Sequence, residues 1–197
     1  SSELGKSVTL RALMRLHPPG SSELSGTLQV GDDEVLTMSA SQLRRYRGGR
    51  CAMIFQEPLL AFDPVYTVGQ QIIEGLRRHE GLSRQAARDR ALEALRQVRI
   101  PSPERRLDAY PHEMSGGMRQ RAMIALALSC NPQLLLADEP TTALDATVQI
   151  QILILLREQQ KQRGLSIVFV THDIGAAVEI ADRVAVMYAG RIVEEAS

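Results

Sequence analysis

Residues 114–121 read MSGGMRQR, and residues 134–140 read LLLADEP. The first stretch places a serine and two glycines at the start of a helical pattern, where free backbone N–H groups and the positive end of the helix dipole attract an anion. The second is a short apolar run, typical of a buried strand, that ends in two adjacent carboxylates. Together they predict an α/β domain equipped to hold a nucleoside triphosphate and hydrolyse it.

The rest of the chain alternates apolar strands with helices. Strands are expected at residues 51–55, 134–137, 165–170 and 183–187, and helices at 8–16, at 118–130, from 147 and from 174. A hairpin is expected around Gly31-Asp32-Asp33 and forms an antiparallel edge. Helical spacing over residues 68–99, with Ser83 as an N-cap, predicts a helical insertion that a loop at 101–111 closes. This order favours a mostly parallel sheet covered by helices.

Composition narrows the classes of function. The 197 residues are 44% hydrophobic, enough for one domain with a sizeable core and a small subdomain. The 23 basic and 23 acidic side chains cancel, so no overall field favours nucleic acid or anionic lipid. No apolar run reaches the roughly 20 residues that cross a bilayer, so we expect a cytosolic protein that reaches a membrane through protein partners. Cys51 and Cys130 are expected to be buried thiols without a ligand role.

Gly5, Lys6 and Ser7 stand directly before the first helical pattern. This order matches the last three positions of the P-loop pattern, in which backbone N–H groups cradle phosphates, lysine neutralises them and serine ligates magnesium. The alternative is a simple helix start, because so short a match is common by chance. Lys6 is one of only two lysines in the chain, which favours the phosphate role, since a flexible point charge follows a phosphate better than a planar guanidinium.

Two features argue against a complete phosphate cradle. Glu3 and Leu4 occupy positions where small residues are usual, and a carboxylate there repels phosphates. A P-loop also follows a central strand, and no residues before Ser1 are present to build that strand. We therefore expect the chain to be a fragment with a truncated N-terminal strand, and to bind ATP weakly.

Polar residues follow three of the expected strands. Asp138 is expected to hold magnesium and Glu139 to polarise an attacking water as general base. His172 can donate a hydrogen bond to a terminal phosphate, and Gln56 can touch magnesium or the attacking water. Each has a plainer alternative when taken alone: a solvated acidic turn, a structural histidine and a turn glutamine. Because strand ends meet at one edge of a parallel sheet, the shared site is favoured.

In combination, these motifs resemble those of the ATP-binding cassette (ABC) ATPases, from Gly5 to about Glu195. The matching motifs, in the order of the family, are the tail of Walker A at Gly5-Lys6-Ser7, the Q-loop at Gln56, the signature at residues 114–118, Walker B ending at Asp138-Glu139, the D-loop at Ala143-Leu144-Asp145 and the switch histidine at His172. The sequences of residues 64–69, 110–121 and 140–145 are similar to the corresponding motifs of the ATP subunits of bacterial oligopeptide, dipeptide and nickel importers.

The resemblance implies a P-loop NTPase fold of the ABC type, with a RecA-like core at residues 1–65 and 112–197 and a helical subdomain at 66–111. It also implies ATP and Mg²⁺ as ligands and a head-to-tail homo- or heterodimer around the nucleotide. The implied nucleotide-binding residues are Gly5, Lys6, Ser7, Ser115, Gly116, Gly117 and Asp145. Lys6 and Ser7 of one subunit and Ser115 and Gly117 of its mate enclose the ATP. The implied metal-site residues are Ser7, Gln56 and Asp138, and the implied catalytic residues are Glu139, His172 and Gln56.

Further partners implied by the resemblance are two transmembrane permease subunits and, indirectly, a solute-binding protein, but no nucleic acid. The subunit is then peripheral, on the cytoplasmic face of the inner membrane, and powers uptake of a peptide or similar small solute. Two other interpretations remain open: a soluble ABC-type ATPase that acts on nucleic acid or the ribosome, and an ATP-binding scaffold without turnover. Repair clamps of the nucleic-acid class separate the two halves of the ATPase with a long coiled coil. Here only about 130 residues separate Lys6 from Asp138, and they contain no sustained heptads, which argues against such a clamp.

Overall fold

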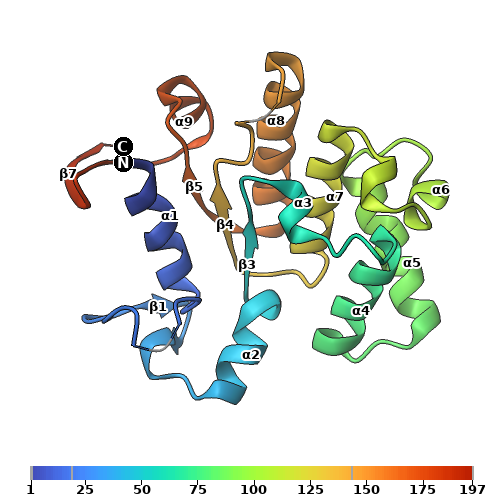
Figure 1. The fold of residues 1–197 in the computed structure, drawn as a ribbon, viewed down its shortest axis with the longest axis horizontal. Coiled ribbons are helices and arrows are strands. Elements are labelled where there is room, and N and C mark those ends of the chain that lie inside the picture. Colours follow the sequence, from blue (N-terminus) through green and yellow to red (C-terminus); the bar gives the residue numbers. More distant parts are fainter. Residues whose placement is uncertain (1, 19, 143, 197) are drawn as a thin grey trace.

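The computed structural model describes residues 2–18, 20–142 and 144–196 (Figure 1). Its helices are α1 (Ser2–Leu13), η1 (Val35–Thr37), α2 (Ala40–Gly49), α3 (Pro58–Ala61), α4 (Val68–Glu80), α5 (Arg84–Gln97), α6 (Pro103–Leu107), η2 (Pro111–Glu113), α7 (Gly116–Leu128), α8 (Ala146–Arg163) and α9 (Ile174–Ile180). Its strands are β1 (Gln29–Val30), β2 (Asp33–Glu34), β3 (Cys51–Ile54), β4 (Leu134–Asp138), β5 (Ser166–Val170), β6 (Val184–Tyr188) and β7 (Arg191–Ala196).

The centre of the molecule is a parallel sheet in the order β3-β4-β5. Successive side chains of a strand point to opposite faces, and here both faces are covered. Ala52, Ile54 and Leu135 belong to a core shared with α4, α5, α7 and α8. Met53 and Leu136 belong to a second core shared with α1 and α2. Burial on both faces explains why these strands are continuous apolar runs rather than alternating ones.

Local sequence signals set several helix starts. Ser83 caps α5 as predicted, because its side chain accepts a hydrogen bond from the Ala86 amide. Thr67 and Gln70 form a reciprocal capping box at the start of α4. A second box, made by Ser39 and Gln42, starts α2, a helix that the hydrophobic pattern did not predict.

Two helices differ from the sequence-based expectation. The loop predicted at residues 101–111 contains α6, because Pro103 suits the first turn of a helix, where its missing N–H costs nothing. Helix α1 was expected at residues 8–16, but it begins at Ser2 and ends at Leu13. It ends early because Arg15 adopts a left-handed conformation, with φ of 52°.

The predicted strand at residues 183–187 exists as β6, but it is not part of the parallel sheet. It pairs antiparallel with β7 in a separate two-stranded sheet. The turn at Ala189 and Gly190, both with positive φ, reverses the chain between the two strands. The predicted N-terminal hairpin is confirmed as β1 and β2, with only two residues in each strand.

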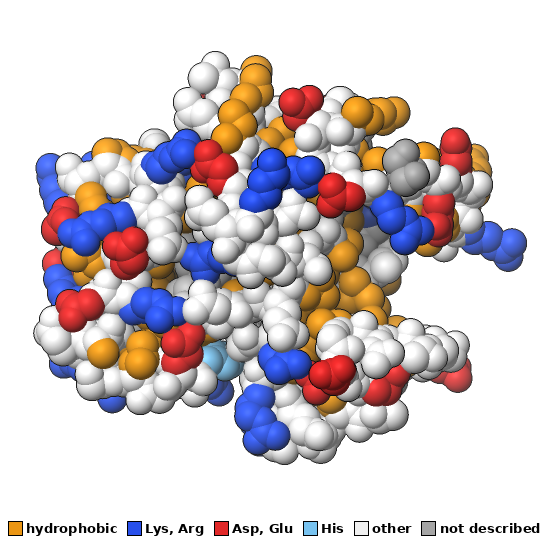
Figure 2. All heavy atoms as spheres, turned by 180° about the vertical axis from the view of Figure 1, so that it is seen from behind, with side chains coloured by type: hydrophobic (Ala, Val, Ile, Leu, Met, Phe, Trp, Pro, Cys, Tyr) orange, Lys and Arg blue, Asp and Glu red, His pale blue; other side chains and the backbone are white. Residues whose placement is uncertain are grey.

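An apolar groove separates β5 from β6. Its volume is about 520 Å³, and its walls include Leu10, Leu13, Val168 and Val184. On the side of the molecule where α1 and the β6–β7 hairpin lie, Figure 2 shows hydrophobic side chains gathered around a hollow. Among the described residues, β5 pairs with β4 along one edge, and the groove lies along its other edge.

Two expectations from composition can be compared with the structure. Cys51 is buried, and burial raises the pKa of its thiol to about 11. Cys130 is half-buried, and burial likewise raises the pKa of its thiol. Burial therefore disfavours the thiolate form at both positions, and the expected burial is found for Cys51 but is only partial for Cys130. No helix in the described part of the chain combines the length and apolar character that a bilayer span requires.

The packing of α4 on the segment that ends α6 gives a testable prediction. A β-carbon placed on buried Gly69 would come within 2.6 Å of the Leu107 Cγ, whereas one on Gly75 of the same helix meets nothing within 4 Å. We expect Gly69→Ala to lower the free energy of unfolding by about 1–3 kcal/mol through overpacking. Gly75→Ala should raise it by about 0.5–1 kcal/mol through helix propensity. Urea unfolding followed by circular dichroism measures both, and equal stabilities of the two variants would contradict the packing described.

Candidate functional site

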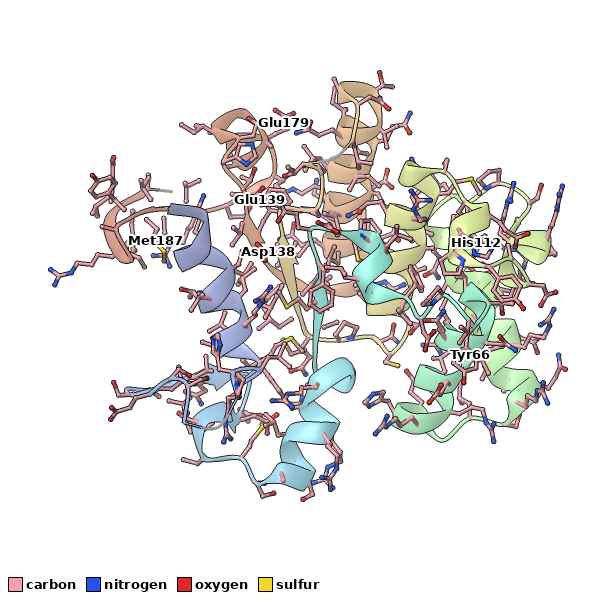
Figure 3. All side chains as sticks on the ribbon, in the orientation of Figure 1. Tyr66, His112, Asp138, Glu139, Glu179 and Met187 are labelled. Carbon is pink, nitrogen blue, oxygen red and sulfur yellow. The ribbon has the colours of Figure 1, made fainter. Side chains whose placement is uncertain are left out.

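Three parallel strands end at the same edge of the central sheet. Strand β4 ends at Asp138 and is followed by Glu139, and register pairs Asp138 with Val170 at the end of β5. His172 follows β5, and Gln56 follows β3 two residues after Ile54. Figure 3 shows Asp138 and Glu139 at the end of β4, above the sheet. The predicted convergence of strand ends is therefore present in the fold.

Helix α1 meets this edge through Lys6 and Ser7. The Ser7 hydroxyl donates a hydrogen bond of 2.9 Å to Asp138 Oδ1. The Lys6 ammonium donates to the carbonyl oxygen of Thr171, at 3.2 Å. Asp138 is only 5% exposed, so the serine hydroxyl satisfies a carboxylate that is largely out of water.

Glu139 is buried and has a strained backbone. It is 5% exposed, and its φ is 45°, an uncommon value for a residue with a side chain. Its amide donates to the Val170 carbonyl at 3.0 Å, which ties the residue to the end of β5. Its Oε2 is 3.2 Å from His172 Nδ1 and accepts a 2.7 Å hydrogen bond from the Thr142 hydroxyl. Strain of this kind persists where surrounding contacts hold it, as at many functional sites.

The remaining predicted site residues lie elsewhere or make no contact with this group. Ser115 caps α7 by accepting from the Met118 amide, and Gly116 and Gly117 form the first turn of that helix. Asp145 caps α8 in the same way. Gln56 is exposed. Across the described ranges, no hydrogen bond or ion pair joins any of these five residues to the group at the sheet edge.

The structure thus separates most of the predicted site residues into two groups, and Gly5 and the exposed Gln56 belong to neither. We call Lys6, Ser7, Asp138, Glu139 and His172 the edge group. The second group lies at the starts of α7 and α8. These two helix starts are close together, as shown by the distance of 3.0 Å between a β-carbon placed on Gly117 and Val148 Cγ1 of α8. Ala143, which belongs to the same D-loop as Asp145, lies outside the described residues.

The segment Gly5-Lys6-Ser7 differs from the expected phosphate cradle. It lies inside α1, which begins at Ser2, rather than in a loop before a helix. Only the first four N–H groups of a helix lack a partner within it, so the amides of Lys6 and Ser7 are used by the helix itself. Only the side chains of these two residues are therefore available to a ligand in this conformation. The side chains of Glu3 and Leu4 are not among those described.

The edge group has the ligand chemistry that Mg²⁺ prefers. Ser7 Oγ and Asp138 Oδ1 are two hard oxygens 2.9 Å apart, and magnesium is typically held by one or two protein oxygens together with phosphate and water. No cluster of three or more histidine, cysteine or carboxylate side chains that could form an all-protein metal site occurs among the residues described. The donor set therefore fits a metal that arrives with a phosphate ligand.

Sequence reasoning missed two members of this neighbourhood. The Thr171 carbonyl, which accepts from Lys6, carries no signal in the sequence because every residue has a carbonyl. Thr142 does carry one: it stands three residues after Glu139, with Pro140 between them, a spacing that predicts a tight turn.

Comparison with solved structures places the fold in a known class. The chain superposes on a structure entitled "Dimeric structure of a post-hydrolysis state of the ATP-binding cassette MJ0796 bound to ADP and Pi" with a TM-score of 0.83 and 29% identity. The match covers 98% of this chain and 80% of that one. The fold is therefore that of an ATP-binding cassette, and the expected α/β fold class is confirmed.

The chain belongs to the ABC transporter family, whose sequence model matches residues 1–142. It is 54% identical over 194 residues to the probable peptide ABC transporter ATP-binding protein y4tR of Sinorhizobium fredii, covering 98% of this chain and 58% of that protein. It is 52% identical over 192 residues to the oligopeptide transport ATP-binding protein OppD of Bacillus subtilis, covering 96% of this chain and 53% of that protein. The chain thus spans little more than half the length of these relatives.

The cap at Ser115 gives a second prediction. Ser115→Ala removes the acceptor for the Met118 amide and should lower the free energy of unfolding by about 1 kcal/mol. Ser115→Asp keeps a capping oxygen, so its stability should stay close to that of the unmodified chain. Chemical denaturation measures both variants. If Ser115→Ala proves as stable as the unmodified chain, the cap contributes no stability and serine at this position has another role.

Proposed function

We propose that this chain is the ATP-binding and ATP-hydrolysing part of an importer subunit that powers uptake of a peptide or a similar small solute. The observation that carries the proposal is the edge group, in which a lysine, a serine, two buried carboxylates and a histidine from three elements meet at one edge of the sheet. The names of its relatives, which are ATP-binding proteins for peptide and oligopeptide transport, support the solute class.

In this proposal, Lys6 neutralises the phosphates of ATP, and Ser7 and Asp138 hold Mg²⁺, with Gln56 as a further contact. The bound metal supplies charge neutralisation at the phosphates. Among the described residues, the Lys6 ammonium donates to the Thr171 carbonyl, a bond that a phosphate can replace with a stronger, charge-assisted one. The structure requires one further change: α1 must unwind as far as Gly5 to free the amides that a phosphate cradle uses.

Glu139 is the proposed general base, which accepts a proton from the attacking water. Its burial suits this task, because the carboxylate is held by few, fixed partners rather than by bulk water. His172 lies beside the same carboxylate, and its side chain is 55% exposed, so the imidazole can turn toward a terminal phosphate and donate to it.

A head-to-tail dimer, homo- or heteromeric, explains why the second group lies apart. Ser115, Gly116 and Gly117 sit at the open N-terminal end of α7, where a helix attracts an anion. We propose that this end, with Asp145, faces the nucleotide bound by the edge group of a second subunit. The solved neighbour is entitled a dimeric structure, which supports the arrangement by analogy.

The segment after Gln56 is the proposed contact with two membrane permeases. Four large apolar side chains are exposed there, at 53% for Leu59, 76% for Leu60, 68% for Val65 and 51% for Tyr66. Contiguous exposed apolar side chains mark surfaces that bind protein or membrane. The subunit would then sit peripherally at the cytoplasmic face of the inner membrane, with a solute-binding protein as an indirect partner. The balanced charge of the chain argues against a nucleic-acid partner.

The conformation of α1 gives a prediction for the chain of 197 residues. Because binding must first unwind the helix through Gly5, Lys6 and Ser7, we expect Mg-ATP to bind with a Kd of about 1 mM or weaker, close to −4 kcal/mol. Isothermal titration calorimetry measures this affinity directly. Micromolar binding would show that α1 does not obstruct the phosphates.

The proposed catalytic role of Glu139 is tested by Glu139→Gln in the full-length subunit. Loss of the base should lower the ATPase rate by about 10²- to 10⁴-fold. The matched control is Glu179→Gln, which changes an exposed glutamate of α9 and should leave the rate unmodified. A coupled phosphate-release assay reports both. Equal rates for Glu139→Gln and the unmodified subunit would remove the assigned base. Salt-resistant binding of nucleic acid would instead favour a clamp over an importer.

A further inference from the structure

The chain turns sharply after Glu139. The Thr142 amide donates to the Glu139 carbonyl at 3.3 Å, which closes a four-residue turn with Pro140 at its second position. Proline favours this position because its fixed φ matches the turn. The Leu144 amide then donates to the Thr141 carbonyl at 3.1 Å and continues the bend. The turn brings the side chain of Thr142 back over the carboxylate of Glu139.

The contact between these two side chains is short. The Thr142 Oγ1 lies 2.7 Å from Glu139 Oε2. The hydroxyl is the donor and the carboxyl oxygen accepts, and the distance is that of a well-formed O–H···O hydrogen bond. Glu139 is 5% exposed, and a hydrogen bond in such a place is stronger than one in water.

The two donors that meet at Oε2 are held differently. His172 lies 3.2 Å away and its side chain is more than half exposed, so it is free to leave when another partner appears. Thr142 is fixed to Glu139 by the backbone of the turn itself. Of these two side chains, Thr142 is therefore the one that can keep the carboxylate oriented while the histidine moves.

We infer that Thr142 is a positioning residue that orients the Glu139 carboxylate toward the attacking water. The inference rests on the proposed role of Glu139 as the base. Backbone hydrogen bonds already close the turn, so the hydroxyl is not needed to form it. Its remaining task is to fix one carboxylate oxygen, and with it the direction of the other, at a residue whose backbone is itself strained.

Substitution of Thr142 in the full-length subunit tests the inference. Thr142→Val keeps the shape and removes the donor, and it should lower kcat about tenfold while the KM for ATP changes less than about twofold, because Thr142 acts only on the base. Thr142→Ser restores the hydroxyl and should return kcat to within about threefold of the unmodified rate. Thr37→Val is the control, since Thr37 is also exposed and its hydroxyl donates to a backbone oxygen three residues before it.

A double variant separates this inference from the proposed function. In a Glu139→Gln background, Thr142→Val should cause no further loss, because its effect passes through the carboxylate. A tenfold loss in that background as well, or an unmodified kcat for Thr142→Val, would overturn the positioning role. An unmodified rate for Glu139→Gln alone would instead remove the role of Glu139 as base. Urea unfolding of Thr142→Val checks that a fall in kcat does not reflect a fall in folded protein.

Discussion

The pairing of β4 with a strand on each side is the constraint on which the rest of the structure depends. Leu135 and Leu136 are fully buried on opposite faces of this strand, one in each hydrophobic core. The strand is therefore fixed by hydrogen bonds at both edges and by packing on both faces. It delivers Asp138 and Glu139 to the edge where α1 and the end of β5 can reach them. The position of the carboxylates is a consequence of apolar packing.

Buried carboxylates in turn require donors, and this requirement organises the edge of the sheet. Ser7 satisfies Asp138, and Thr142 and His172 satisfy Glu139. The partners that the structure gives these carboxylates are hydroxyl and imidazole groups rather than arginine or lysine side chains. Apart from His172, no basic side chain among the described residues forms an ion pair with these two carboxylates, so the site suits a positively charged ligand such as a divalent metal.

The sequence allowed the edge of the sheet to be predicted because each of its strands is a short apolar run followed at once by polar residues. Lys6, Ser7, Asp138, Glu139 and His172 are indeed brought together. The start of α1 was not predictable, since the pattern before Val8 suggested a loop and only the fold shows helix from Ser2. The pairing of β6 depends on the turn at Ala189 and Gly190, a local preference that hydrophobic periodicity does not register. Thr142 was overlooked because its partner is set by the turn.

The edge of β5 that faces away from β4 has no strand partner among the described residues. Its N–H and C=O groups border the groove of about 520 Å³ rather than another strand of the described fold. Such an edge can accept an extended backbone segment as a further strand. Asp182 and Arg183, at the wall of the same groove, are paired with Arg157 and Glu195. An apolar groove beside an unpaired strand edge can therefore offer an extended segment both backbone hydrogen bonds and packing.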